Sequence, residues 1–152
     1  MKKLLGISIL KQSNNKVLEQ IKKYIALHQI FCHIVSLNSE NIVVAQKDKE
    51  FKRIIETAQI KIIDGIGIVL AAQILGIPIG ERLTGADLMG KLIVSAKKSR
   101  LTVLLIGGRP NLALSLSKCY QEQFPEAKFI GIEGFRNIKK PTKKEEEKIL
   151  SI

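Results

Sequence analysis

The sequence has no tryptophan, and phenylalanine and tyrosine together supply only 5% of its 152 residues. Proteins that bind single-stranded nucleic acids stack the bases on neighbouring aromatic side chains, and no such group of residues is evident in this chain. We therefore expect no nucleic acid among its partners.

Cysteine is equally scarce, since Cys32 and Cys119 are the only two in the chain. Both lie in apolar stretches, and neither belongs to a CxxC motif or to a cluster with histidine, which excludes a disulfide framework and a zinc site. They are interpreted as reduced core thiols of a cytosolic protein, and His28 and His33 as surface or boundary residues. We expect neither a metal ion nor a cofactor.

Long apolar runs are also absent. The most apolar stretch, residues 66–79, is interrupted by Gln73 and Pro78 and is shorter than the ~20 residues that span a bilayer. The apolar run at the N-terminus is too short for a signal peptide. We therefore expect no membrane-spanning helix.

Acidic residues are few beside basic ones, with 14 Asp and Glu against 25 Lys and Arg and a formal net charge of +11. Much of the excess lies in residues 1–30 and 136–152. Such a charge favours an anionic partner, namely a nucleotide, a lipid diphosphate or an anionic membrane surface. The alternative is a solvated basic surface that only keeps the protein soluble.

Short apolar runs alternate along the chain with segments of helical spacing. Strands are expected at residues 4–9, 33–37, 61–63, 102–106 and 128–132, and helical faces between residues 17–28, 43–58, 68–75, 88–96 and 112–124. This order predicts an α/β fold, with a mostly parallel sheet and helices on both faces, as in Rossmann-like domains. The core is expected over residues 1–135, and the charged residues 136–152 are expected to begin a further helix.

Several segments allow finer predictions. The run Thr102–Ile106 is apolar enough for the middle of a parallel sheet. Ser39 and Thr84 are predicted N-caps, the latter with Asp87 three residues later as in a capping box. The last long helix is expected to bury Leu112, Leu116, Cys119, Tyr120 and Phe124.

Ligands of parallel sheets bind beyond the carboxyl ends of the strands, where this chain has small polar residues and glycines. Ser36 and Asn38 are able to hydrogen-bond a sugar, and the alternative is that they only form a turn. Gly107 and Gly108 are able to cradle a nucleotide with backbone N–H groups, and the alternative is a tight strand-to-helix turn.

Asp64 is the main candidate for chemistry. A carboxylate at the end of a strand as apolar as Ile62-Ile63 is partly removed from water, which makes it a better base. Gly65 and Gly67 leave out side chains beside it, so that a ligand can approach the backbone closely. The alternative is that Asp64 only caps the following helix.

Arg82 follows the turn at Pro78 and precedes the helix that is expected to begin at Thr84. The fork of a guanidinium group suits a diphosphate, and the free N–H groups after Thr84 add to such a site. The alternative is a surface arginine paired with Glu81 or Asp87. Asp87 itself fits better as a cap than as a catalyst.

Taken together, these segments resemble the WecG/TagA/CpsF glycosyltransferase family. The matching stretches are Val35–Glu40 (VSLNSE), Ile63–Ala72 (IDGIGIVLAA), Glu81–Met89 (ERLTGADLM), Leu104–Pro110 (LLIGGRP) and Phe124-Pro125. The resemblance covers nearly the whole chain.

The resemblance implies a metal-independent, inverting enzyme that uses a UDP-sugar as its donor. The family typically transfers N-acetylmannosamine, or a related sugar, to N-acetylglucosamine on undecaprenyl diphosphate, for teichoic acid or other surface polysaccharides. A cytoplasmic protein at the inner face of the plasma membrane is therefore expected, and an unpaired edge of its sheet predicts a homo-oligomer.

By position, Asp64 is similar to the family's proposed general base and Arg82 to the arginine of its second motif. Ser36 and Asn38 are similar to its substrate-binding residues, although Ser36 stands where the family usually has threonine. The remaining residues expected to bind substrate are Gly65, Thr84, Asp87, Gly107 and Gly108.

Family members continue through further strands, a Pro-Arg-Gln-Glu-type motif and an arginine-bearing tail, none of which this sequence contains. The resemblance therefore implies an incomplete C-terminal part, with weak or no transferase activity alone. The alternative is a non-catalytic module that binds a nucleotide sugar or associates with itself through an exposed sheet edge. An NAD-linked enzyme is disfavoured, because Leu70 stands where the dinucleotide fingerprint needs a third small residue.

Overall fold

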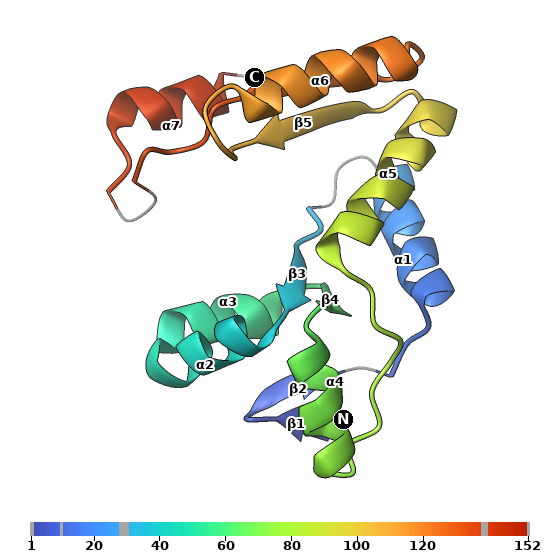
Figure 1. Cartoon of the computed structure of the whole chain (residues 1–152), viewed down its shortest axis with the longest axis vertical. Helices are drawn as coiled ribbons and strands as arrows, with labels where there is room; N and C mark the ends of the chain where they lie inside the picture. Colours follow the sequence, from blue (N-terminus) through green and yellow to red (C-terminus); the bar gives the residue numbers. More distant parts are fainter. Residues whose placement is uncertain (1, 10, 28–30, 138–139, 152) are drawn as a thin grey trace. The chain divides into compact units, whose positions relative to one another are not determined.

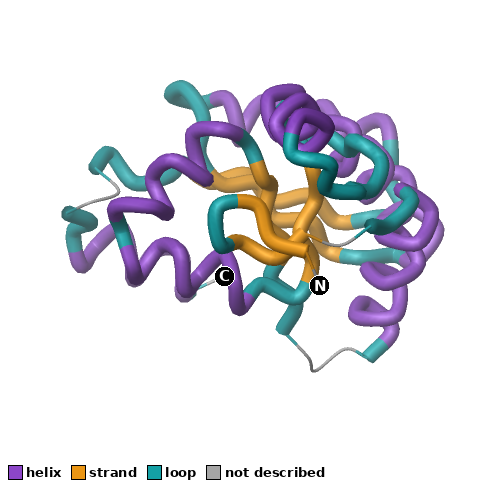
Figure 2. The backbone as a smooth tube through the Cα atoms, turned by 90° about the horizontal axis from the view of Figure 1, so that it is seen from below, coloured by secondary structure: helices purple, strands orange, loops and turns teal. Residues whose placement is uncertain are grey.

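The computed structural model describes residues 2–9, 11–27, 31–137 and 140–151, and the chain forms two compact units, Met1–Leu88 and Met89–Ile152. Figure 1 shows the helices and strands in chain order, and Figure 2 shows that the strands are short beside the helices and loops. Each unit contains one parallel strand pair, which confirms the α/β fold class. The expected core over residues 1–135 stays a prediction.

The first unit begins with a hairpin rather than with the single strand predicted at residues 4–9. Strands β1 (Lys2–Leu4) and β2 (Ile7–Ile9) pair antiparallel, with Leu4 opposite Ile7. Leu5 and Gly6 both have positive φ, at 48° and 82°, which is the backbone that a two-residue hairpin turn requires. The prediction is wrong because periodicity alone did not show this turn.

Helix α1 (Asn14–Ala26) confirms the first predicted helix and buries Val17 and Ile21. His28, expected near its end, lies outside the described residues, and His33 is half-buried. Strands β3 (Ile34–Leu37) and β4 (Ile60–Ile63) then pair in parallel. The carboxyl ends of the two strands, at Leu37 and Ile63, therefore lie side by side at the same end of the sheet.

Two helices replace the single one predicted between β3 and β4. Helices α2 (Ser39–Lys47) and α3 (Lys49–Thr57) lie side by side in Figure 1. Asp48 separates them, because its extended backbone ends α2 and its side chain accepts the Phe51 N–H at the start of α3. This break leaves Val43 and Ile54, both predicted to face inward, exposed to solvent.

The N-cap of α2 is Asn38 and not Ser39. Asn38 has an extended backbone, and its side-chain oxygen accepts the Asn41 N–H at 2.8 Å. The cap prediction was therefore wrong by one residue. Helix α4 (Ile66–Ile74) follows β4, as predicted, and ends before Gly76, whose φ is +60°. One cluster of buried hydrophobic side chains in this unit contains Leu4, Ile7, Ile9, Leu37, Ile42, Ala45, Ile55, Ile63 and Ile68.

Helix α5 (Gly85–Ser99) leads into the second unit, where β5 (Thr102–Ile106) and β6 (Lys128–Ile132) pair in parallel. Both strands confirm the predicted ranges. The expected place of β5 in the middle of a sheet is wrong, since among the described strands it pairs with β6 alone. Thr102 and Ile106 at its ends are exposed.

Helix α6 (Leu112–Gln123) packs through its small residues. Ala113 and Ser117 are buried, whereas Leu112 and Cys119, both predicted to face inward, are exposed. Small residues are needed there because α6 lies directly against Gly131 of β6, where an added Cβ would be 2.1 Å from the Ala113 carbonyl oxygen. Figure 1 shows α6 running along this strand pair.

The prediction of two core thiols holds for neither cysteine. Cys119 is exposed on α6, and Cys32 is half-buried, where burial raises the pKa of its thiol. Larger side chains fill the core beside α6 instead, since Tyr120 lies 5.6 Å from Phe129 between ring centroids and 6.4 Å from Phe124.

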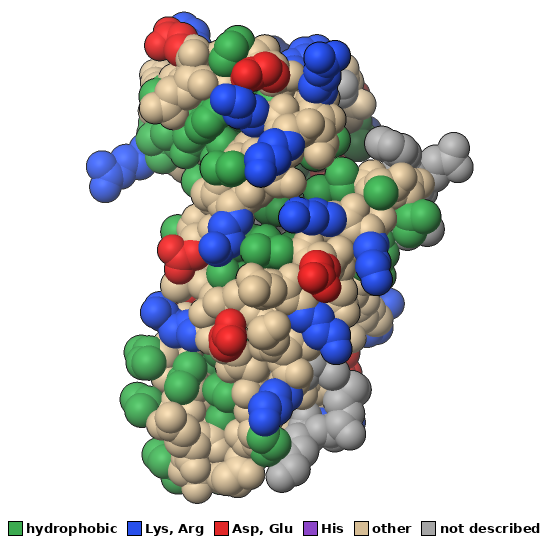
Figure 3. Space-filling model, turned by 90° about the vertical axis from the view of Figure 1, so that its right-hand side faces the viewer, with side chains coloured by type: hydrophobic (Ala, Val, Ile, Leu, Met, Phe, Trp, Pro, Cys, Tyr) green, Lys and Arg blue, Asp and Glu red, His purple; other side chains and the backbone are tan. Residues whose placement is uncertain are grey.

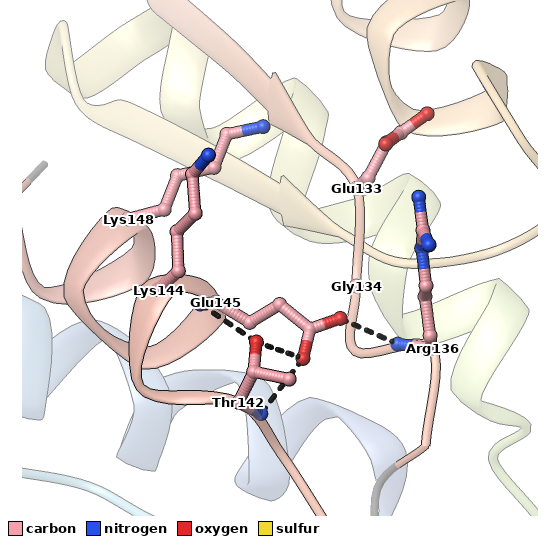
Figure 4. Close-up of a pocket in the computed structure, with 7 residues that line it drawn as sticks. All are labelled: Glu133, Gly134, Arg136, Thr142, Lys144, Glu145 and Lys148. Carbon is pink, nitrogen blue, oxygen red and sulfur yellow. Dashed lines mark hydrogen bonds between the residues drawn. The ribbon is translucent and has the colours of Figure 1, made fainter.

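Helix α7 (Lys143–Leu150) confirms the helix expected near the C-terminus and begins with a capping box. The Glu145 carboxylate accepts the Thr142 N–H and hydroxyl, both at 2.8 Å, and the Arg136 N–H at 3.1 Å (Figure 4). These donors, first of all the two backbone N–H groups, lower the pKa of Glu145 to about 2.

We expect the start of α7 to loosen in acid because of this depressed pKa. The hydrogen bonds contribute fully above the ordinary glutamate pKa of 4.5, and their contribution is lost as the pH falls through about 2. Amide chemical shifts of residues 142–146, followed by NMR from pH 6 to pH 2, measure the change. Glu145→Gln is expected to abolish this titration and Glu147→Gln to preserve it; a titration that survives in Glu145→Gln contradicts the assignment.

Candidate functional site

Asp64, directly after β4, stands at the centre of the predicted site in the first unit. Its Oδ2 accepts the Ser36 hydroxyl at 2.6 Å and the backbone N–H of Gly85 at 3.3 Å. Within the described residues no hydrogen bond reaches Oδ1. The half-buried carboxylate is thus fixed through one oxygen and leaves the other available to a ligand.

The alternative that Asp64 only caps α4 is not what the structure shows. The N-cap of α4 is Gly65, and no side chain makes a cap hydrogen bond to that helix. The Asp64 carboxylate lies instead at the first N–H of α5, which belongs to Gly85. A helix N-terminus favours a negative charge at this position.

Arg82 lies beside Asp64 because residues 82–83 run alongside β4. Arg82 forms a parallel bridge with Ile63, and the Leu83 N–H donates to the Ile63 carbonyl oxygen at 2.8 Å. The Arg82 Nε donates to the Asp64 carbonyl oxygen at 2.6 Å. This hydrogen bond fixes the Nε end of the guanidinium group next to the candidate carboxylate.

Arg82 makes no ion pair with Glu81 or Asp87 in the part of the chain that the structure describes. Glu81 accepts the Asn14 N–H at 2.9 Å, and Asp87 accepts the Thr84 hydroxyl at 2.6 Å. Thr84 in turn accepts the Asp87 N–H at 3.1 Å, so both residues act in the cap of α5, as predicted. The positive charge of Arg82 is therefore not neutralised by its nearest acidic neighbours.

Gly65 and Gly67 lie close to the loop that follows β3. An added Cβ at Gly65 would lie 3.0 Å from the Asn38 Cα, and one at Gly67 would lie 2.3 Å from the Ser39 Oγ. The expectation that these glycines open the backbone to a ligand stays a prediction. They allow the loops after β3 and β4 to meet, and the parallel pairing of β3 with β4 brings Ser36 to Asp64.

The structure also adds contacts that the sequence did not indicate. The side-chain nitrogen of Asn14, at the start of α1, donates to the Arg82 carbonyl oxygen at 3.3 Å. The Glu81 N–H donates to the Gln12 carbonyl oxygen at 3.0 Å. The segment before α1 thus supports the loop that carries Arg82. These pairs are more than 60 residues apart in sequence, and no local pattern announces them.

Gly107 and Gly108 belong to the second unit and line a pocket of about 630 Å³ at the carboxyl ends of β5 and β6. Arg109, Glu133 and Arg136 line the same pocket. The sequence patterns predict no role in the site for these three residues. The feature of the sequence that indicates them is their position shortly after the predicted strands that became β5 and β6.

Neither a metal centre nor a membrane span is found where the structure describes the chain. No group of three or more His, Cys, Asp and Glu side chains in residues 2–9, 11–27, 31–137 and 140–151 is arranged to hold a metal ion. No helix within those ranges is long and apolar enough to cross a bilayer.

Comparison with known proteins shows that this chain is similar to sugar transferases. Residues 2–151 match the family described as "Glycosyl transferase WecG/TagA/CpsF family". The chain is 24% identical over 142 residues to the N-acetylglucosaminyldiphosphoundecaprenol N-acetyl-beta-D-mannosaminyltransferases of Staphylococcus aureus strains NCTC 8325 / PS 47 and COL. The match covers 91% of this chain and 55% of each relative. The chain thus spans about half the length of the curated relatives it matches.

Proposed function

The chain belongs to the WecG/TagA/CpsF family of glycosyltransferases, and from this premise we propose that it transfers a sugar to a lipid-linked acceptor. The donor is a UDP-sugar carrying N-acetylmannosamine or a related sugar. The acceptor is N-acetylglucosamine on undecaprenyl diphosphate, and the product enters the synthesis of teichoic acid or another surface polysaccharide.

The observation that carries this proposal is the geometry of Asp64. Ser36 and Gly85 hold Oδ2, so Oδ1 is oriented by the same two hydrogen bonds. A general base must be held within hydrogen-bond reach of the proton that it takes. Asp64 therefore suits the removal of a proton from the hydroxyl of the acceptor sugar.

The proposed reaction is a single displacement. The acceptor oxygen attacks the anomeric carbon of the donor, a new C–O bond forms, and the bond from that carbon to the UDP oxygen breaks with inversion. Asp64 receives the proton of the acceptor hydroxyl and later returns it to water. UDP leaves with the bonding electron pair.

Arg82 is proposed to stabilise the diphosphate on which negative charge develops. Its Nε is held by the Asp64 carbonyl oxygen, and the rest of its guanidinium group is exposed. Charge-assisted hydrogen bonds from arginine to phosphate oxygens are about twice as strong as neutral ones. The residue that carries the proposed base, Asp64, thus also holds the positive charge of Arg82 through its backbone carbonyl oxygen.

The lipid nature of the acceptor is supported by α4. Ile66, Leu70 and Ile74 are 60%, 52% and 85% exposed and follow one another at intervals of four residues, which places them on one side of the helix. This row begins two residues after Asp64 and extends for about 12 Å. An isoprenoid chain bound to it would start next to the proposed base.

The proposed place of action is the inner face of the plasma membrane. Figure 3 shows more basic than acidic side chains on the surface in view. The net charge of +11 favours attraction to anionic lipid headgroups. Association of two or more copies is also proposed. Among the described strands, β3 and β4 form one two-stranded sheet and β5 and β6 another, and unpaired backbone groups at the edge of a sheet favour pairing with a second chain.

A single-turnover assay tests the function directly. The purified chain, in excess, is mixed with radiolabelled UDP-N-acetylmannosamine and a short-chain analogue of the lipid acceptor in detergent. We expect a labelled disaccharide-lipid to form slowly, because the chain spans about half the length of its relatives, and at the same rate with and without EDTA, because the family resemblance implies metal-independent transfer. Loss of the product in EDTA would contradict metal independence.

The second candidate is a module that binds the nucleotide sugar without turnover. It is favoured by one observation, that the chain spans about half the length of the relatives named as transferases. Calorimetry with UDP, run beside the transfer assay, separates the two candidates. Binding without any product supports the module and overturns the transferase.

A further inference from the structure

The segment that joins α4 to α5, residues 75–84, carries Arg82 and passes the start of α1 (Figure 1). The Glu81 N–H donates to the Gln12 carbonyl oxygen at 3.0 Å. An added Cβ at Gly80 would lie 2.6 Å from the Gln12 backbone nitrogen and closer still to its carbonyl oxygen. Because both of these atoms are backbone, only glycine lets the two segments lie this close. The chain just before α1 is therefore in direct contact with the residues that lead to Arg82.

Asn14, the first residue of α1, makes two further hydrogen bonds to the same segment. Its backbone N–H donates to the Glu81 carboxylate at 2.9 Å, and its side-chain nitrogen donates to the Arg82 carbonyl oxygen at 3.3 Å. The first N–H groups of a helix have no partner within the helix and favour a negative charge. The first turn of α1 contains no acidic residue, so Glu81 supplies this charge from 67 residues away in sequence.

Strand β4 and the residue after it hold the other groups of Arg82. The Arg82 backbone forms a parallel bridge with Ile63, and its Nε donates to the Asp64 carbonyl oxygen at 2.6 Å. A shift of the Arg82 backbone would move Nε relative to this oxygen, and a hydrogen bond tolerates a change of only a few tenths of an ångström. The contact between Asn14 and the Arg82 carbonyl oxygen therefore bears on where the guanidinium group lies.

The side-chain oxygen of Asn14 is buried and has no hydrogen-bond partner among the described residues. An unpaired buried acceptor lowers the stability of a fold. The useful part of this side chain is therefore its nitrogen, which donates to Arg82. A side chain that costs stability and contacts the site is expected where function decides the choice of residue.

We infer that Asn14 is a positioning residue for Arg82. Together with Glu81, it fixes the Arg82 backbone against the start of α1, and the Arg82 Nε–H then meets the Asp64 carbonyl oxygen in the observed orientation. The consequence for sugar transfer rests on the proposed function, which assigns stabilisation of the leaving diphosphate to Arg82. The consequence for the Arg82 side chain itself does not depend on that function.

NMR of the Arg82 Nε–H group in the full chain tests the inference without any substrate. Asn14→Ala is expected to shift this signal and to speed its exchange with water about 2- to 10-fold, the worth of one hydrogen bond between uncharged groups. Asn14→Asp keeps the size of the side chain but replaces the donor by an oxygen, so the same effect is expected. Amide exchange over residues 17–26 of α1 is expected to stay unchanged in both variants.

Asn15→Ala is the matched control. It removes the same kind of side chain from the next position of α1, where Asn15 is exposed and forms no side-chain hydrogen bond within the described part of the chain. Any general effect on the first turn of the helix is therefore shared by the two alanine variants. Asn15→Ala is expected to leave the Arg82 Nε–H signal and its exchange rate unchanged.

The transfer assay measures what the position of Arg82 does for the reaction. Asn14→Ala is expected to lower the single-turnover rate at saturating donor about 2- to 10-fold and to change the half-saturating donor concentration by less than about 2-fold. In an Arg82→Ala background, Asn14→Ala is expected to lower the rate no further, because Asn14 acts through Arg82. A role in the stability of the fold alone would lower the rate by the same factor in both backgrounds.

The outcomes separate this inference from the proposed function. An Arg82 Nε–H signal that stays in place in Asn14→Ala, or that moves as far in Asn15→Ala, overturns the inference whether or not the chain transfers sugar. An equal fall of the transfer rate in both backgrounds also overturns it. A chain that makes no product overturns the proposed function, and a shift of the Nε–H signal in Asn14→Ala but not in Asn15→Ala then still supports the positioning of Arg82.

Discussion

Replacement of Asp64 by asparagine is expected to lower the single-turnover rate of sugar transfer by about 10²- to 10⁴-fold, the usual contribution of a general base. The amide has nearly the same shape as the carboxylate, and its oxygen is able to accept the Ser36 hydroxyl and the Gly85 N–H. It does not take up a proton at neutral pH. The fold is therefore expected to survive while the chemistry is lost.

Asp48→Asn is the matched control for this experiment. Asp48 lies in the same unit and caps α3, a position that asparagine fills as well as aspartate. It is expected to leave both the melting temperature and the transfer rate unchanged. A transfer rate in Asp64→Asn equal to that of the Asp48 variant would remove Asp64 as the base.

Ser36 gives a graded companion to the Asp64 variant. Ser36→Ala removes the 2.6 Å hydrogen bond to Oδ2 and is expected to reduce the rate about 10- to 100-fold, because one bond to a charged group is worth roughly 1.5–3 kcal/mol. Ser36→Thr keeps the hydroxyl and is expected to retain most of the activity. Equal rates for the two variants would contradict a positioning role for this hydroxyl.

The second large effect concerns the second unit, where Gly131→Ala is expected to destabilise the protein by about 3 kcal/mol. The added Cβ would lie 2.1 Å from the Ala113 carbonyl oxygen and 2.6 Å from the Ser117 Oγ. The first of these atoms is backbone, so α6 must move away from β6 to relieve the overlap. At roughly 2–4 °C for each kcal/mol, the melting temperature is expected to fall by about 6–12 °C.

Gly90→Ala is the control for this substitution, since Gly90 lies within α5 and an added Cβ there meets nothing within 4 Å. Alanine is favoured over glycine inside a helix by about 0.5–1 kcal/mol, so this variant is expected to melt slightly higher than the unchanged protein. Circular dichroism melts of both variants measure the difference. A Gly131→Ala protein as stable as the unchanged one would contradict the tight packing of α6 on β6.

The sequence alone was sufficient where a signal is local and repeated. Runs such as Thr102–Ile106 and Lys128–Ile132 coincide with β5 and β6, because strands that are mainly apolar stand out from helical spacing. The cap formed by Thr84 and Asp87 was also predicted correctly, since a cap needs only residues three positions apart. The motifs that resemble the family were sufficient to indicate it.

Local patterns failed where a single residue changes the direction of the chain. The turn at Leu5-Gly6 divides one apolar run into two strands, and Asp48 divides one helical pattern into two helices. Both features depend on the backbone conformation of one or two residues, whereas a periodic pattern of apolar residues is read over a whole segment and does not show it. The face of α6 was misjudged for a related reason, because Gly131 on another element selects Ala113 and Ser117 over larger residues.

For the site, the sequence by itself determined which residues are present at the strand ends: Ser36, Asp64 and Arg82, with two glycines after β5. Only the tertiary structure decided what each of them contacts. It places the Ser36 hydroxyl and the Gly85 N–H on one oxygen of Asp64 and holds the Arg82 Nε on the carbonyl oxygen of Asp64. These partners are 18 to 28 residues apart in sequence, and the parallel pairing of β3 with β4 and the bridge to Arg82 bring them together. Hydrogen bonding depends on distances of a few ångströms, which residue order alone does not specify.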